Sequence, residues 1–89
     1  MLDLTRTKSY LQVDFEDDDD FINLLVNASY IYLQNCTGKD FSQINNSLAD
    51  LFCLALIKEC YDNRDLTVAK AGDKLRHVMQ SILIQLTYN

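Results

Sequence analysis

The residues best equipped for chemistry in this 89-residue sequence begin with a run of five acids. They are Glu16, Asp17, Asp18, Asp19 and Asp20. A calcium-binding EF-hand loop needs glycine at its sixth position and a bidentate glutamate at its twelfth. Counted from Asp14, those positions hold Asp19 and Leu25, so the spacing excludes this kind of site. We interpret the run as a solvated acidic surface that complements the partial positive charge at the start of the following helix. The functional alternative, compatible with the first, is a negative surface that repels DNA or meets a basic partner.

The other candidates are a single histidine and three cysteines. We expect His77 on the exposed, polar side of the last helix. Cys53 and Cys60 are seven residues apart on an apolar helix, which indicates small core residues, and Cys36 adds no zinc-binding spacing. An odd number of cysteines without a secretory signal predicts reduced thiols.

Motifs that support catalysis are missing from the sequence. It has no glycine-rich phosphate loop and no serine nucleophile on a strained turn beside a histidine–acid pair. We therefore predict no catalytic, cofactor-binding or metal-binding residues, and a protein that is not an enzyme.

Composition predicts one small all-α domain over residues 1–89. Hydrophobic residues make up 48% and charged residues 24%, which is typical of globular chains. The absence of proline and the presence of only two glycines disfavour an all-β fold, which needs many tight turns. The longest apolar run, 51–57, is far shorter than the roughly 18–20 residues of a membrane span. We expect no membrane contact and, without an N-terminal signal, a cytosolic location.

Charge is distributed unevenly along the chain. Residues 1–41 carry eight acids and three bases, a net charge of −5, whereas residues 42–89 are neutral overall. Binding to a nucleic-acid backbone needs clustered lysines and arginines. The charge pattern therefore disfavours a DNA-binding protein.

Apolar periodicity and capping residues predict four helices. We expect them at 5–13, 18–37, 47–61 and 74–86, with loops at 39–46 and 65–72. Asp3 or Thr5 would cap the first helix, a box of Ser47 and Asp50 the third, and Asp73 the fourth. Two residues are expected at helix ends, namely Gly38 in a left-handed conformation and Arg64 near the negative end of a helix dipole.

The second and third predicted helices are apolar on more than one face. Such surplus apolar surface usually marks a partner surface, so we predict self-association or docking on a larger assembly. The alternative is that the two helices simply cover each other. The residues expected in the core are Phe21, Leu25, Ala28, Leu51, Leu75, Ile82 and Leu83.

The order of several short motifs resembles a known family. Its first half is the run Tyr10-Leu11-Gln12-Val13-Asp14, the acids 16–20, and a helix from Phe21-Ile22 to Thr37-Gly38. Its second half is an apolar helix that ends in Tyr61-Asp62-Asn63-Arg64. Together they resemble the small head–tail connector, or adaptor, proteins of long-tailed double-stranded-DNA phages. One departure is Gly72-Asp73-Lys74-Leu75, where many members carry a Leu-Pro pair before the last helix.

The resemblance implies a structural protein of virion assembly with an all-α fold of about four helices. It implies a homo-oligomeric ring that joins the portal vertex of the DNA-filled capsid to the tail and extends the DNA channel. The implied partners are other copies of the chain, the portal protein and the next neck or tail-completion protein. DNA would pass without sequence-specific binding. The implied location is the capsid–tail neck of the virion, and the host cytoplasm during assembly.

Within that framework we assign two surfaces from the helical pattern. The subunit interface is expected at Tyr30, Ile31, Leu54 and Ile57, on the backs of the two central helices. Contact with the portal or neck protein is expected at Leu66, Val68, Lys70 and Ile84. Arg64 is expected either to cap its helix or to bridge to a neighbouring subunit.

One rival interpretation keeps the same fold but changes the function. A small acidic regulatory protein, or a DNA mimic, would also be helical and negative and would bind a basic partner. It would spread its acids over a face, whereas here the excess lies in one run.

Overall fold

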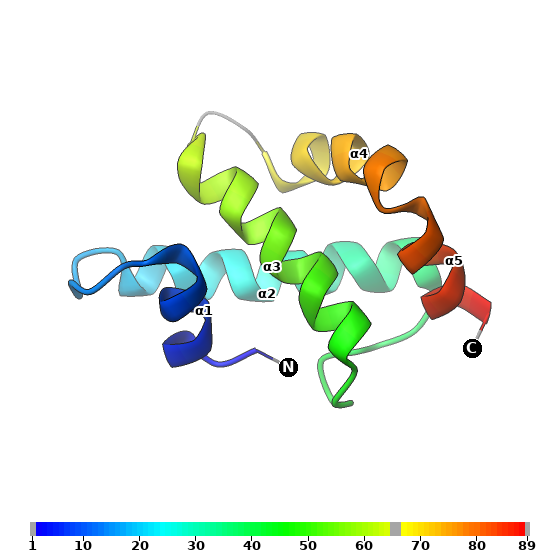
Figure 1. Ribbon diagram of the computed structural model, residues 1–89, viewed down its shortest axis with the longest axis horizontal. Coiled ribbons are helices and arrows are strands. Elements are labelled where there is room, and N and C mark those ends of the chain that lie inside the picture. The colour runs from blue at the N-terminus through cyan, green and yellow to red at the C-terminus, as the bar shows by residue number, and fades with distance from the viewer. Residues whose placement is uncertain (1, 65–66, 89) are drawn as a thin grey trace.

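The computed structural model describes residues 2–64 and 67–88, and these ranges fold into five helices without a strand. The helices are α1 (Leu4–Leu11), α2 (Asp19–Thr37), α3 (Ser47–Asp62), α4 (Val68–Val78) and α5 (Gln80–Tyr88). Figure 1 shows α3 crossing α2, with α1 beside the first half of α2 and with α4 and α5 toward its other end. The all-α prediction is confirmed, with one helix more than expected.

The first two helices begin and end close to their predicted residues. Asp3 caps α1 by accepting a hydrogen bond from the amide of Arg6 at 2.7 Å. The helix ends earlier than predicted because Gln12 adopts a left-handed conformation, with φ of 59°. Gly38 ends α2 at φ of 75°, as expected of a residue without a Cβ.

The start of α3 corrects the predicted capping box. Asn46 is the cap, and its side-chain oxygen accepts from the amides of Leu48 at 3.0 Å and Ala49 at 3.1 Å. Ser47 is already inside the helix. The carboxylate of Asp50 accepts from the hydroxyl of Tyr30 instead of from a backbone amide.

The C-terminal part differs most from the prediction. A helix begins at Val68, inside the expected loop, and Thr67 caps it by accepting from the amide of Lys70 at 3.2 Å. Asp73 is therefore not a cap but lies within α4. A turn at Met79 separates α4 from α5, so the single helix predicted at 74–86 is two.

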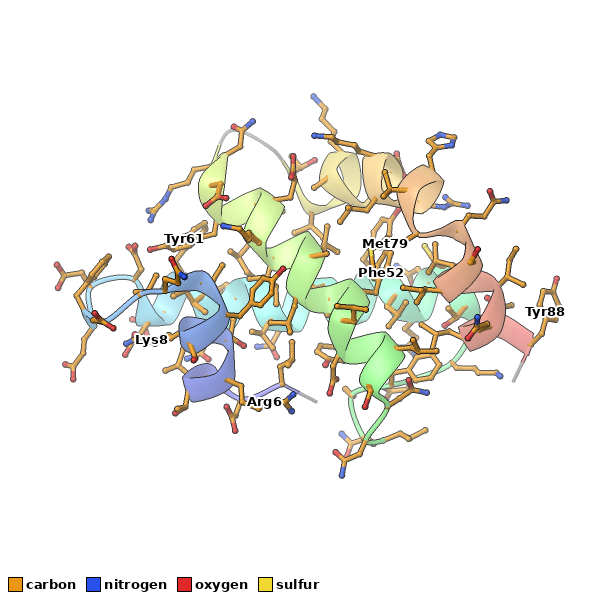
Figure 2. All side chains as sticks on the ribbon, in the orientation of Figure 1. Arg6, Lys8, Phe52, Tyr61, Met79 and Tyr88 are labelled. Carbon is orange, nitrogen blue, oxygen red and sulfur yellow. The ribbon has the colours of Figure 1, made fainter. Side chains whose placement is uncertain are left out.

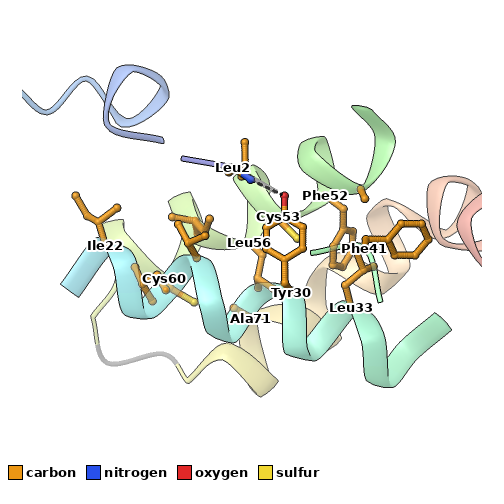
Figure 3. Packing of buried hydrophobic residues seen from close by; sticks show 14 of the residues in the cluster. Leu2, Ile22, Tyr30, Leu33, Phe41, Phe52, Cys53, Leu56, Cys60 and Ala71 are labelled. Carbon is orange, nitrogen blue, oxygen red and sulfur yellow. Dashed lines mark hydrogen bonds between the residues drawn. The ribbon is translucent and has the colours of Figure 1, made fainter. Parts of the chain in front are cut away.

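Helix α3 is the centre of the core and contacts α1, α2, α4 and α5. Its fully buried residues include Phe52, Cys53 and Leu56, which pack against α2 and the segment after it (Figure 3). Both Cys53 and Cys60 are buried free thiols, as predicted. Burial raises the pKa of the Cys53 thiol to about 12, so it stays protonated near neutral pH.

The predicted core is largely right, with one error. Leu25 is buried, and four others pack against the core while partly exposed, namely Phe21, Leu75, Ile82 and Leu83. Ala28 is half-buried. Leu51 is 45% exposed, because it shares the solvent side of α3 with Ser47 and Lys58.

Helix α4 attaches to α2 through an unusually close approach. A Cβ added at Gly72 would lie 2.3 Å from the Cζ atom of Tyr32. The hydroxyl of Tyr32 donates to the carboxylate of Asp73 at 2.9 Å. Glycine at position 72 thus lets the helix rest on the aromatic ring.

Candidate assembly interface

The outward side of α2 is the most distinctive surface of the molecule. Residues 21–38 contain no charged side chain. Leu24 is 67% exposed and Ile31 is 60% exposed, and seven residues separate them, so they share one helix face. We define the α2 face by its exposed residues Asn23, Leu24, Asn27, Ile31 and Gln34. Depletion of charge together with exposed aliphatic side chains is typical of the centre of a protein interface.

A shallow hollow lies beside the α2 face and has a volume of about 340 Å³. Ile31 and Gln34 line it from α2, and Ser42 and Gln43 line it from the following loop. Asp40 also lines it, and its carboxylate accepts from the Ser42 amide at 2.9 Å. The hydrogen bonds from Ser42 lower the pKa of Asp40. The hollow therefore extends the polar character of the α2 face and adds one carboxylate to it.

Two of the four residues predicted at a subunit interface lie inside the chain instead. Tyr30 is 4% exposed, and its hydroxyl accepts from the amide of Leu2 at 3.1 Å (Figure 3). The same hydroxyl donates to the carboxylate of Asp50. Burial and the Asp50 carboxylate raise the pKa of Tyr30. Ile57 is completely buried. The prediction was wrong because the N-terminal segment and the flanking helices cover the sides of α2 and α3 that a helical wheel leaves open.

The other two predicted interface residues differ in exposure. Ile31 lies at the centre of the α2 face. Leu54 is half-buried and packs against the core of the same chain. The exposed apolar surface expected on both central helices is therefore found mainly on one side of α2. On α3, Leu51 is the one apolar residue that is exposed, and Leu48, Leu54, Ala55 and Tyr61 are half-buried.

The acidic run divides into structural and solvated members. Asp18 accepts from the hydroxyl of Tyr61 at 2.8 Å and from the guanidinium of Arg64 at 2.7 Å. These hydrogen bonds lower the pKa of Asp18. The Arg64 guanidinium also lies 4.8 Å from the centre of the Phe21 ring. Arg64 thus joins the end of α3 to the start of α2 within one chain, which neither predicted role anticipated.

The remaining acids play simpler roles. Asp19 forms an ion pair with Lys8 at 2.7 Å, which ties α1 to α2. Glu16, Asp17 and Asp20 are exposed. Sequence reasoning missed the contacts of Asp18 because their partners lie more than 40 residues away.

A second surface is a groove between α4, α5 and the end of α2, with a volume of about 680 Å³. Arg76 and His77 line it from α4, Leu83 and Ile84 from α5, and Cys36 from α2. Ile84 is 50% exposed, and His77 is exposed as predicted.

The residues predicted to contact the portal or neck protein do not form one patch. Ile84 lines the groove, Lys70 is exposed on α4, and Val68 is half-buried against the core. Leu66 lies outside the described residues. Figure 2 shows α5 at one end of the molecule, with Tyr88 at its tip, whereas α4 extends back toward the middle.

Residues 2–64 and 67–88 offer neither a metal-binding cluster nor a membrane-spanning helix. No group of three or more histidine, cysteine or acidic side chains in these ranges could hold a metal ion. None of the helices there combines the length and apolar content that crossing a bilayer requires.

Comparison with known proteins gives one match. A family model described as phage gp6-like head-tail connector protein matches residues 1–86. This range includes α1 to α4 and all but the last two residues of α5. No curated protein and no solved structure gives a significant match.

Proposed function

The chain belongs to the phage gp6-like head–tail connector family, and from this membership we propose that it forms the ring between the portal vertex and the tail. The family is one of structural proteins that act in virion assembly rather than of enzymes. Its members work with other head and tail proteins in the virion. The proposed ring is built from copies of this chain and extends the channel through which DNA passes.

The observation that supports the ring is the α2 face. A ring subunit must present one surface to each neighbour, and such surfaces are rarely charged at their centre. The α2 face offers an uncharged helix surface around Ile31, which the fold of a single chain leaves in solvent. We assign Ile31 to the centre of a subunit contact, with Leu54 as a second candidate.

The portal and the next neck or tail-completion protein are the proposed partners along the ring axis. We assign contact with them to the α4–α5 region, through Val68, Lys70 and Ile84. These residues belong to the last two helices, of which α5 lies at one end of the molecule (Figure 2).

The charge of the chain fits passage of DNA. A net charge of −5 repels the phosphate backbone, so a ring of such subunits would let DNA slide instead of holding it. DNA is therefore expected to pass through the ring without sequence-specific binding.

A gene-deletion experiment tests the proposal in the phage that encodes this chain. Without the chain, electron microscopy should show capsids and tails that remain separate, and the wild-type chain supplied from a plasmid should restore joined particles. Purified portal particles incubated with the chain should gain an added ring of density at the tail-facing end. Normal tailed virions in its absence would refute the proposed function.

A further inference from the structure

We propose that the α2 face of one copy packs antiparallel against the outward side of α3 in the next copy, with Asp20 of the first paired to Lys58 of the second. This inference rests on the proposed function and identifies the surface that the α2 face meets in the ring. We define the α3 face by four residues that follow one another on the side of α3 away from its buried residues. They are Ser47, Leu51, Leu54 and Lys58.

The two faces lie on opposite sides of the molecule. Helices α2 and α3 pack against each other and bury side chains such as Leu33 and Phe52 in one core. Helical periodicity then places the exposed residues on the far side of each helix. Figure 1 looks down the shortest dimension, 17 Å, and shows α3 crossing over α2. Different surfaces on opposite sides of identical subunits can join head to tail, and such contacts close into a ring when the rotation between subunits allows.

The α3 face shares the main property of the α2 face. Residues 51–57 contain no charged side chain, just as residues 21–38 contain none. Leu51 is 45% exposed and Leu54 is half-buried, so both still have surface to lose to a partner. Covering Leu24 and Ile31 with these residues removes aliphatic surface from water without burying an unpaired charge.

The spacing of residues is the same on both faces. Successive positions on each helix are separated by four, three and four residues, so the two rows can lie side by side as packed helices do. The row on α2 is Asp20, Leu24, Asn27 and Ile31, and the row on α3 is Ser47, Leu51, Leu54 and Lys58. Because this spacing reads the same in both directions, it fits a parallel and an antiparallel contact equally well.

Charge selects the antiparallel direction. In a parallel contact, Lys58 would lie against Ile31, where its ammonium would be buried beside an aliphatic side chain. In an antiparallel contact, Lys58 lies opposite Asp20, Leu54 lies opposite Leu24, and Leu51 lies opposite Asn27. An ion pair then forms at the edge of an uncharged contact, where charged residues are common in protein interfaces.

Both members of the proposed ion pair have capacity for it. Asp20 is exposed and forms no ion pair among the residues that the structure describes. The Lys58 ammonium lies 3.0 Å from Asp62, one turn further along α3, and both side chains are exposed. An exposed pair of this kind contributes little to stability, and an ammonium has three donors. Lys58 can therefore accept Asp20 as a second partner.

Disulfide trapping in rings formed on purified portal particles tests the contact. Asn27→Cys and Leu51→Cys are made as separate variants, each with Cys36→Ser, and Cys53 and Cys60 are buried. After mild oxidation of a mixture of the two variants, we expect a disulfide between positions 27 and 51, identified by mass spectrometry. Neither variant alone should form it. One chain that carries both new cysteines should give covalent chains of several copies.

A matched mixture provides the control. Ser9→Cys, also with Cys36→Ser, places a thiol on an exposed position of α1 outside both faces. Mixed with Leu51→Cys, it should cross-link about tenfold more slowly, which corresponds to a preference of about 1.4 kcal/mol for the proposed contact. Far-ultraviolet circular dichroism confirms that each variant is folded.

Charge reversal tests the direction of the contact. Asp20→Lys should raise the concentration needed to form rings on the portal by about two- to fivefold, the size of an exposed ion pair. The double variant Asp20→Lys with Lys58→Glu should restore assembly, because each copy then offers both reversed charges. Asp17→Lys, at an exposed acid outside the α2 face, is the control and should assemble like the wild type.

Several outcomes overturn the inference. Disulfide dimers of Asn27→Cys alone would show a two-fold contact between α2 faces. Equal rates in the two mixtures, or position 27 linked only to the portal, would each refute the contact with α3. Failure of the double variant to restore assembly would refute the antiparallel direction. Rings that form without the 27–51 disulfide refute this inference alone, whereas a wild-type chain that forms no ring on the portal refutes the proposed function.

Discussion

The crossing of α2 and α3 and the attachment of α4 are built in different ways. The crossing buries large apolar side chains such as Phe52, Ile22 and Leu33, each almost completely hidden. Helix α4 instead hides the small side chain of Ala71 and rests Gly72 against the Tyr32 ring, with one tyrosine–aspartate hydrogen bond and an exposed ion pair between Lys74 and Glu59. Its larger apolar residues Val68 and Leu75 are only partly buried against the core. Large buried side chains therefore hold the first region, whereas the second combines partly buried apolar contacts with a close steric fit at Gly72.

The largest expected loss of stability follows from removing a buried side chain where α3 crosses α2. Phe52→Ala removes a fully buried aromatic side chain at the centre of α3. It should lower the free energy of unfolding by about 3–5 kcal/mol, because lost burial and the cavity left behind both cost free energy. Chemical denaturation followed by circular dichroism measures the change. Leu51→Ala, on the exposed side of the same helix, is the control and should cost much less.

A side chain added at position 72 should weaken the packing of α4 against α2. Gly72→Ala forces the Tyr32 ring to move, which should cost about 1–3 kcal/mol, partly offset by about 1 kcal/mol of helix propensity. Amide exchange should increase in α4 more than in α3. Combining Gly72→Ala with Tyr32→Leu should recover part of the loss by removing the clash. Two independent, additive losses would contradict the steric explanation.

The same contrast explains what could be predicted from the sequence. The bounds of α2 and α3 were predicted almost to the residue, because their apolar positions and the end signal at Gly38 are local. The start of α4 was missed because Gly72 and Asp73 suggest a loop and a cap when taken alone. Only the ring of Tyr32, 40 residues away, explains why a helix passes through them.

Candidate site residues were harder to predict than helices. A helical wheel places Tyr30 and Ile57 on open faces, but Leu2 and the flanking helices cover them. The contact of Asp18 with Tyr61 and Arg64 also depends on tertiary structure. Ile31 was placed correctly on the surface because no other segment of the chain covers that side of α2.

Low pH should weaken the contact of Asp18 with Tyr61 and Arg64, which joins the start of α2 to the end of α3. The pKa of Asp18 is lowered in the folded chain by its hydrogen bonds to Tyr61 and Arg64. Its stabilising effect is therefore complete above the unfolded pKa of about 3.9 and is lost as the pH falls through the lower folded value. Asp18→Asn should be less stable than wild type at neutral pH, and the difference should shrink in acid.

Asp20→Asn is the control for this measurement. Asp20 is exposed in the same first turn and forms no ion pair among the described residues. Urea unfolding at a series of pH values should give a smaller pH-dependent difference for Asp20→Asn. Equal profiles for both variants would mean that general helix-dipole effects, and not the contacts of Asp18, explain the acid sensitivity.

The smallest effect on stability is expected at the α2 face. Ile31→Asp should change the free energy of unfolding by less than about 0.5 kcal/mol, because the side chain is 60% exposed. It should nevertheless abolish ring assembly, since a charge at the centre of a subunit contact would be buried without a partner. Ile44→Asp places the same charge at another exposed isoleucine outside the α2 face and should assemble normally. Native mass spectrometry and electron microscopy of portal-bound rings measure assembly. If Ile31→Asp unfolds the chain, Ile31 belongs to the crossing; if it assembles like Ile44→Asp, the α2 face is not the subunit contact.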